Sequence, residues 1–302
     1  MKPFQSGFGQ SGTWVQRLAL PVGVLFLGAG CAAAPKHGPA TPSPAAGPSP
    51  AETPLSPDAQ RDVKYALSGR HQYAVYRRDS IAVQMPSGEF QVQNLGRTAF
   101  LTITLVPAGA DARAVVTLDS IRPDPDLYIP ATALDSAAGT QWTGRLLSSG
   151  RWADLMATQR SRLGDQVGSE LQTLFPILPP GGVRLGAQWS DSSTRRLKIG
   201  TIEATEAGET RYGAVGSESY DGASSLRIEG ARTATLTGAG DASGPALAGT
   251  ATDSMTYHVG VDGRVLGGSG TETADLTLTV MSVGQAVPAR QISHFHFDAI
   301  GR

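Results

Sequence analysis

The sequence predicts a mainly β protein of the α+β class, with curved antiparallel sheets in two β-rich halves that are joined by one amphipathic helix. Three observations support this prediction. Apolar and polar residues alternate along most of the chain after residue 57, as they do in half-buried strands. Asp221-Gly222 and Asp262-Gly263 separate such runs, and Asp-Gly favours a two-residue hairpin turn, so neighbouring strands are expected to be antiparallel. A single segment has the helical period instead.

The first thirty residues have the pattern of a signal peptide. Their apolar run, Leu18–Gly30, follows two basic residues and contains 13 residues, whereas a helix that spans a membrane needs about 20. The run ends at Cys31, the only cysteine of the chain. The motif Gly28-Ala29-Gly30-Cys31 resembles the lipoprotein box of bacterial envelope lipoproteins.

This resemblance implies that residues 1–30 are removed and that Cys31 is acylated, which would anchor the protein in a membrane of the cell envelope. Ala32 stands where an aspartate would signal retention at the inner membrane. The resemblance therefore implies the outer membrane, facing the periplasm, in a Gram-negative cell. A plain secretory signal, cleaved near Ala32–Ala34, is the alternative.

Residues 31–57 form the next part of the predicted organisation. They hold eight prolines and too few large apolar residues for a core, so we expect a disordered, extended tether. In polyproline geometry, at about 3.1 Å per residue, this tether spans at most roughly 80 Å. The remaining residues, 58–302, are expected to form one β-rich envelope domain with halves at about 58–151 and 183–302.

The charge of the exported chain is close to zero. Residues 1–30 contain two of the 25 lysine and arginine residues and none of the 26 acidic residues, so their removal changes the formal net charge from −1 to −3. A nearly neutral chain has no electrostatic reason to bind nucleic acid. Because there is no second cysteine, the domain forms no internal disulfide and must rely on its core.

The expected strands follow in order along the domain. Each is a run with period-two alternation or a short apolar run bounded by turn residues. They are Tyr73–Arg77, Ile81–Met85, Phe90–Val92, Thr98–Leu105, Ala114–Leu118, Leu197–Ile202, Thr210–Tyr220, Ser224–Thr237, Ala246–Val259, Val265–Val283 and Ala289–Phe297.

The helical segment is expected at about 152–175, between the two halves. It ends before Pro176–Gly182, a run that no helix tolerates. Its apolar residues and the nearby Trp142 have two interpretations that the sequence leaves open: they anchor the helix in a core, or they line a pocket for an apolar ligand beneath it. These residues are Trp142, Trp152, Leu155, Met156, Leu163, Val167 and Leu171.

Two further resemblances concern the domain. The stretch Leu178–Trp189 contains a Leu-Pro followed by Gly-x-x-Trp. It resembles a sequence motif of uncharacterised bacterial envelope lipoproteins. The β-helix-β layout is similar to the half-barrels of lipoprotein-carrier and lipid-binding envelope proteins. That likeness implies a curved sheet that wraps a helix over an apolar cavity, and it implies no activity.

The last expected strand is the only candidate for metal chemistry. His294, His296 and Asp298 alternate with Phe295 and Phe297, so the first three lie on one face, about 6.6–6.8 Å apart from one to the next. They are a weak candidate metal site. The interpretation that we favour places the phenylalanines in the core and the imidazoles in water.

The sequence therefore favours a non-enzymatic function. It contains no Gly-x-Ser-x-Gly motif and no phosphate-binding glycine loop followed by lysine, so we expect no catalytic residues and no cofactor. The leading hypothesis is a lipid-anchored envelope protein that binds an apolar ligand or a partner protein. The alternatives are a structural or assembly lipoprotein with a solid core and no ligand, and a metal-binding envelope protein.

Overall fold

The computed structural model describes residues 62–301, apart from short gaps at 86, 126–128, 130, 160, 200–201, 241–244 and 281–284. The expected signal peptide (1–30), Cys31 and the expected tether (31–57) lie outside the described residues.

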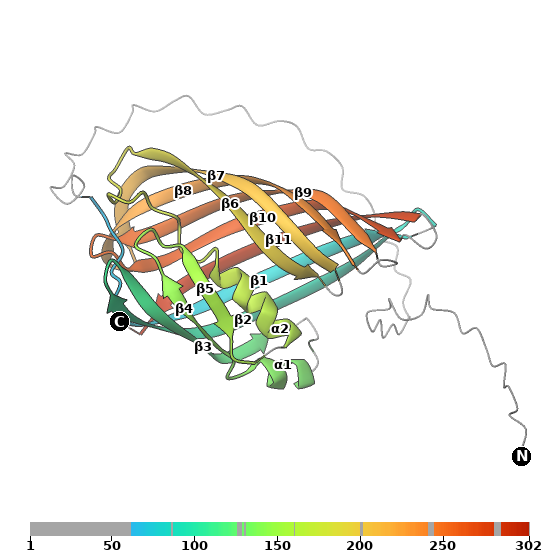
Figure 1. The fold of residues 1–302 in the computed structure, drawn as a ribbon, viewed down its shortest axis with the longest axis horizontal. Helices are drawn as coiled ribbons and strands as arrows, with labels where there is room; N and C mark the ends of the chain where they lie inside the picture. The colour runs from blue at the N-terminus through green and yellow to red at the C-terminus, as the bar shows by residue number, and fades with distance from the viewer. Residues whose placement is uncertain are drawn as a thin grey trace, which may run out of the picture. The chain divides into compact units, whose positions relative to one another are not determined.

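Eleven strands form one open antiparallel sheet, a half-barrel (Figure 1). The order across the sheet is β5-β4-β3-β2-β1-β11-β10-β9-β8-β7-β6. The strands are β1 (Gly69–Gln84), β2 (Phe90–Ala108), β3 (Asp111–Pro123), β4 (Gln141–Leu146), β5 (Trp152–Ala157), β6 (Gln188–Ile199), β7 (Ile202–Tyr220), β8 (Ala223–Ala239), β9 (Ala246–Gly260), β10 (Val265–Val280) and β11 (Gln285–Ile300).

The two predicted halves are two meanders of this one sheet, not separate sheets joined by a helix. β1 pairs with β11 in an unbroken antiparallel register, from Gln72 opposite Ile300 to Val83 opposite Ala289. This pairing joins the first and the last strand in the middle of the sheet. The sheet edges are consequently β5 and β6, the two strands that flank the helical region.

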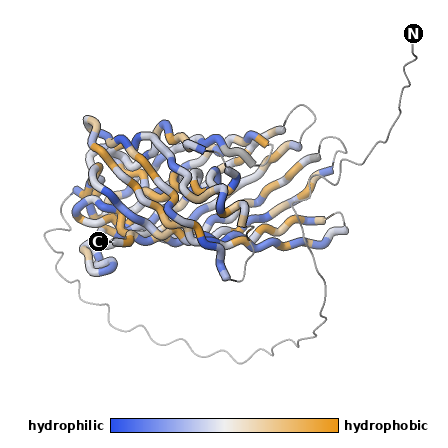
Figure 2. Tube along the Cα trace, turned by 90° about the horizontal axis from the view of Figure 1, so that it is seen from below, coloured by the Kyte–Doolittle hydropathy of each residue, from blue (hydrophilic) through white to orange (hydrophobic). Residues whose placement is uncertain are grey.

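The period-two alternation produces the strands, and the structure merges some of those expected. Apolar and polar residues alternate along the strands (Figure 2). Tyr73–Arg77 and Ile81–Met85, apart from Met85 itself, belong to the single strand β1, and Phe90–Val92 and Thr98–Leu105 both belong to β2. The polar residues that interrupt the apolar pattern in β1 do not end the strand, because Asp79 turns inward and is buried among charged partners.

The predicted helix is shorter than expected, because its first part is β5. Trp152 pairs with Leu146 and Met156 pairs with Thr143 of β4, with an irregular register between them. Asp154 has a φ of 55°, so the faces of β5 do not follow a simple alternation, and the 3–4 spacing in the sequence only imitates a helix.

Two short helices cover part of the sheet (Figure 1). They are α1 (Ala131–Ala137), which the sequence did not predict, and α2 (Arg162–Leu171). Ser161 caps α2 by accepting a hydrogen bond from the backbone N–H of Gly164 at 3.0 Å, as an N-cap serine does. None of the helices in the described part of the chain is both long enough and apolar enough to cross a bilayer.

Candidate functional site

The residues predicted to line a ligand pocket lie mostly in a packed core. Leu155 is partly buried against this core, whereas Met156 is 70% exposed on the other side of β5. The structure thus brings six of the seven predicted residues together and leaves Met156 outside. The core members are Trp142, Trp152, Leu163, Val167 and Leu171, which are all buried.

The segment that follows α2, residues 172–178, fills the interior beneath these residues; we call it the plug segment. Its Phe175 is buried and packs edge-on against Tyr65, Tyr73 and Trp152, with ring centroids 5.7, 6.4 and 5.8 Å apart. Leu174 and Leu178 are also buried. The plug segment therefore occupies the volume that a ligand beneath the helix would need.

Aromatic side chains of the surrounding chain hold the plug segment through its backbone. Tyr257 donates a hydrogen bond to the carbonyl of Thr173 at 3.0 Å, and Trp189 donates one to the carbonyl of Ile177 at 2.6 Å. Tyr65 donates to the carbonyl of Pro176. These bonds satisfy carbonyls that have no partner in a helix or a sheet ladder, which a buried irregular segment requires.

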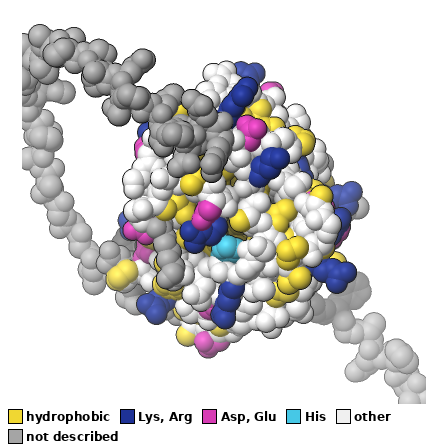
Figure 3. All heavy atoms as spheres, turned by 90° about the vertical axis from the view of Figure 1, so that its left-hand side faces the viewer, with side chains coloured by type: hydrophobic (Ala, Val, Ile, Leu, Met, Phe, Trp, Pro, Cys, Tyr) yellow, Lys and Arg dark blue, Asp and Glu magenta, His cyan; other side chains and the backbone are white. Residues whose placement is uncertain are grey.

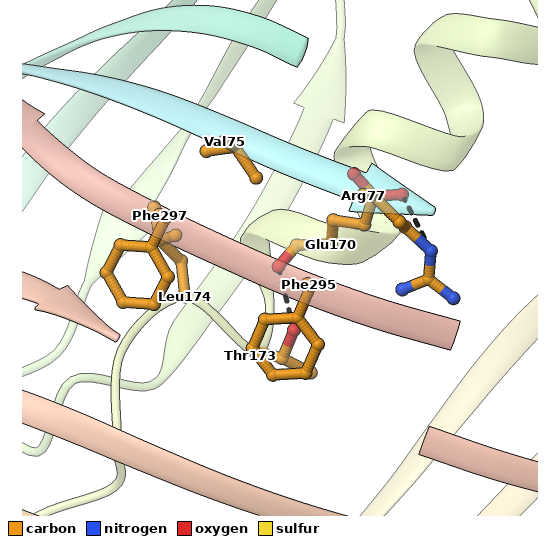
Figure 4. Close-up of a pocket in the computed structure, with 7 residues that line it drawn as sticks. All are labelled: Val75, Arg77, Glu170, Thr173, Leu174, Phe295 and Phe297. Atoms are coloured by element: carbon orange, nitrogen blue, oxygen red, sulfur yellow. Dashed lines mark hydrogen bonds and ion pairs between the residues drawn. The ribbon is translucent and has the colours of Figure 1, made fainter. Parts of the chain in front are cut away.

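A small hollow remains between the plug segment, the end of α2 and the inner face of β1 and β11 (Figure 4). Its cavity volume is about 20 Å³, which suits a water molecule, for which about 10–15 Å³ is needed, and not an acyl chain. The hollow has an apolar side and a charged side. Its lining residues are Val75, Arg77, Glu170, Thr173, Leu174, Phe295 and Phe297.

Glycines of β10 let the two phenylalanine rings of this hollow lie flat on the sheet. A Cβ at Gly268 would come within 2.7 Å of the Phe297 ring, and a Cβ at Gly270 would collide with the Phe295 ring. Phe297 is buried and Phe295 partly buried. The prediction that these phenylalanines face the core is therefore confirmed.

Charged side chains on the concave face form a layer above the hollow; we call it the ionic layer. It arises from strand register, because Asp79, Ser293, Glu272, Asp253 and Arg232 are successive cross-strand partners from β1 to β8. Opposite residues of antiparallel strands point to the same face. The charged members are Arg77, Asp79, Arg97, Glu170, Arg195, Glu206, Arg232, Asp253 and Glu272.

One part of the ionic layer fastens α2 to the sheet. Arg77 Nε lies 2.8 Å from Asp79 Oδ1 and 3.5 Å from Glu170 Oε1, and its Nη2 lies 3.3 Å from Glu272 Oε2. Arg97 also pairs with Glu170. Burial by itself would lower the pKa of Arg77, but the carboxylates of Glu170, Asp79 and Glu272 raise it above its usual value. The two arginines hold Glu170, the only member of the layer that comes from a helix.

The other part of the ionic layer lies nearer β6. Arg195 Nη2 donates to both carboxylate oxygens of Glu206, at 2.7 and 2.9 Å. Arg232 pairs with Glu206, and its Nη1 lies 3.1 Å from Asp253 Oδ2. Burial raises the pKa of Asp253, as does the charge of Glu272, while Arg232 opposes the shift. Asp253 Oδ1 is buried and has no hydrogen-bond partner.

The sequence contained a signal for this layer that the prediction did not use. Arg97, Glu206 and Arg232 occupy inward positions of the alternation, where the neighbouring inward residues are apolar or small. Charged residues at such positions are rare unless they are paired. Their partners come from strands distant in sequence, so the sequence shows that partners are required without showing which ones.

The candidate metal ligands lie on the opposite, convex face of β11. His296 Nε2 lies 2.7 Å from Asp298 Oδ2, and Tyr220 donates to Asp298 Oδ1 at 2.5 Å. His294 is separate from them and contacts Thr271 at 3.1 Å. Among the described residues, no group of three or more histidine, cysteine or acidic side chains could hold a metal ion.

The two edges of the sheet differ. β5 has six residues and an irregular register with β4. β6 has twelve residues and keeps a regular register with β7 from Gln188 to Ile199. In the described part of the chain, no strand pairs with the other side of β6. An edge of this length presents free backbone donors and acceptors, which is where proteins add a strand from a partner.

Comparison with known proteins yields no family: no protein-family model matches the chain, and no curated protein matches it.

Proposed function

We propose that this protein is a non-enzymatic protein of the cell envelope, held at a membrane by acylated Cys31, which binds a partner protein with the outside of its half-barrel. The observation that carries this proposal is the plug segment. It fills the interior beneath α2, and the charged side chains next to it pair with one another. The convex face and the edge strand β6 are then the surfaces available for binding.

The edge of β6 suits an extended segment of a partner. Such a segment would continue the sheet beyond β6 through main-chain hydrogen bonds. Ser192 and Thr194 are exposed on this strand and would lie beside the added strand without obstructing it.

Site-specific photo-cross-linking in cells tests this proposal. A photoreactive residue at Ser192 or Thr194 is expected to give one adduct of defined mass, and mass spectrometry would identify it as another protein or a second copy. Thr233 and Thr252 are the matched controls, because they are exposed on β8 and β9, which are paired with a strand on both sides. Absence of an adduct at β6, or equal adducts at all four positions, would refute binding at this edge.

The membrane anchor is tested separately. Replacement of Cys31 by alanine removes the acylation site, and acyl chains contribute about 0.8 kcal/mol for each buried methylene. We expect Cys31→Ala to leave the membrane fraction or to accumulate as an uncleaved precursor. A variant that fractionates with membranes and is processed as the wild type would contradict the anchor.

An apolar ligand is the second candidate, because Val75, Leu174 and Phe295 give the water-sized hollow of Figure 4 an apolar side. A ligand larger than water would have to displace part of the plug segment. Mass spectrometry of an organic extract of the Cys31→Ala protein decides this point. A stoichiometric lipid in the extract would support the carrier function, and a clean extract would support partner binding.

A further inference from the structure

A notch opens at the end of the sheet where the described chain begins and ends. β11 pairs with β1 only as far as Ile300 opposite Gln72, whereas β1 extends further, to Gly69. On the other side of β11, the pairs with β10 end at Gly267 opposite Asp298. Because β11 ends before the starts of β1 and β10 are paired, a gap remains between those two starts, with a volume of about 40 Å³.

Two arginines stand on opposite sides of this notch. Arg70 lies on the β1 side and is exposed, and no carboxylate of the described residues forms an ion pair with it. Arg264 lies on the β10 side, in the turn that leads into that strand. Its Nε lies 2.6 Å from Asp262 Oδ2, and its two terminal nitrogens form no hydrogen bond with the other described residues. Basic side chains are visible on this end of the molecule (Figure 3).

The remaining polar groups fit an anion rather than a cation. His71 also lines the notch, and its Nε2 is held by the carbonyl of Ser68 at 3.0 Å. Among the described residues, the carboxylate of Asp262 is the only one within ion-pair distance of either arginine. The notch therefore has an excess of positive charge, and guanidinium groups bind the oxygens of phosphate through paired, charge-assisted hydrogen bonds.

We propose that this notch binds a phosphate group, with Arg70 and Arg264 donating hydrogen bonds to its oxygens from opposite sides. The phosphate belongs either to a phospholipid head group or to a free phosphate ion. The position of the notch favours the lipid. The backbone N–H of Ala66 donates to the carbonyl of Gly263 at 3.0 Å, so the first described residues run beside the turn that carries Arg264. The proposal that the phosphate belongs to a lipid rests on the proposed anchor at Cys31. The proposal that the notch binds phosphate does not depend on that anchor.

NMR titration of the full-length chain in non-ionic detergent tests the site, with the arginine Nε–H signals as the readout. Three probes are used: inorganic phosphate, dihexanoylphosphatidylglycerol and dihexanoylphosphatidylcholine. We expect the signals of Arg70 and Arg264 to shift. Arg70→Ala and Arg264→Ala should each weaken binding about fivefold, and the double variant about 25-fold. Arg113→Ala is the control, because Arg113 is exposed on β3 and lies outside the notch.

The outcomes distinguish a lipid head group from free phosphate, and they distinguish the phosphate site from the proposed membrane anchor. Tighter binding of phosphatidylglycerol than of inorganic phosphate identifies a lipid head group, and the reverse identifies free phosphate; both support the site. Unchanged affinity in the double variant, or an equal loss in Arg113→Ala, would overturn it. All variants should melt at the wild-type temperature. Because the readout does not depend on membrane attachment, failure of the Cys31 anchor leaves this result interpretable.

Discussion

Glu206 and Asp253 are both acidic members of the ionic layer, but they differ in the number of arginine partners. Glu206 meets two arginines, Arg195 and Arg232, and its side chain is 5% exposed. Asp253 meets Arg232 alone, and one of its oxygens has no partner. A buried charge is costly unless it is paired. The two acids should therefore respond differently when they are neutralised.

We expect Glu206→Gln to lower the free energy of unfolding by about 3–5 kcal/mol, because it leaves two buried guanidinium groups short of negative charge. Asp253→Asn should cost much less, since Arg232 keeps Glu206 and burial already raises the pKa of Asp253. Urea unfolding at pH 7 measures both. Equal losses at the two positions would contradict the view that Glu206, with its two arginine partners, contributes more to stability than Asp253.

His258 predicts a dependence of stability on pH. Burial lowers its pKa below 6.5, although Glu218 partly opposes the shift. Below pH 6.5 the unfolded chain therefore binds a proton at this residue more readily than the folded chain does. Stability should fall as the pH drops from 6.5 through the lower pKa of the folded state, and His258→Asn should reduce this fall. His294→Asn is the control, because His294 is exposed and forms no ion pair with the other described residues; an unchanged pH profile in His258→Asn would contradict the prediction.

At the scale of elements, α2 depends on close approach to the sheet more than on helix propensity. It contains two glycines, Gly164 and Gly168, which lower helix propensity by about 1 kcal/mol each relative to alanine. A Cβ at Gly168 would lie 2.7 Å from Nε1 of Trp142. Glu170, at the end of the helix, is held by Arg77 and Arg97. Packing and the ion pairs therefore decide where this helix lies.

Gly168→Ala tests this view, because helix propensity and packing predict opposite signs. We expect a loss of stability of about 1–3 kcal/mol from the clash with Trp142, in place of the gain of about 1 kcal/mol that propensity predicts. Ser169→Ala, at the next position of the same helix, is the control and should be neutral or slightly stabilising. A more stable Gly168→Ala in thermal melts would mean that α2 stands further from the sheet.

At the scale of the whole molecule, the pairing of β1 with β11 makes the two meanders one unit. Ile103 of β2 and Ile228 of β8 are fully buried members of the same hydrophobic core cluster. The plug segment contacts both meanders, since Tyr257 of β9 binds the Thr173 carbonyl and Phe175 packs on Tyr73 of β1. Neither meander can lose its structure without exposing the core of the other.

The domain should therefore unfold in one transition. Ile103→Ala and Ile228→Ala, one in each meander, are each expected to cost about 2–5 kcal/mol and to shift the same transition. Tryptophan fluorescence, which reports Trp142, Trp152 and Trp189, should coincide with far-ultraviolet circular dichroism during urea unfolding. Two separate transitions, each shifted by only one of the substitutions, would show that the meanders are independent domains.

The sequence by itself determined the local features of this fold. Alternation along β8 and β11 predicted strands, and it predicted that Phe297 is buried while His294 and His296 face water. The turns Asp221-Gly222 and Asp262-Gly263 predicted hairpins, which the structure confirms between β7 and β8 and between β9 and β10. These features depend on residues close together in the chain, so short-range patterns are sufficient.

Only the tertiary structure decided the features that depend on pairing between distant residues. Trp152, Leu155 and Met156 have helical spacing, yet β5 forms there because β4 offers its backbone for pairing. The interior is filled because the plug segment finds partners in Tyr65, Tyr257 and Trp189, far from it in sequence or across the sheet. The ionic layer exists because strand register and the position of α2 bring charged side chains from seven strands and one helix side by side on the concave face. Local patterns show which side chains turn inward, and long-range register decides what they meet there.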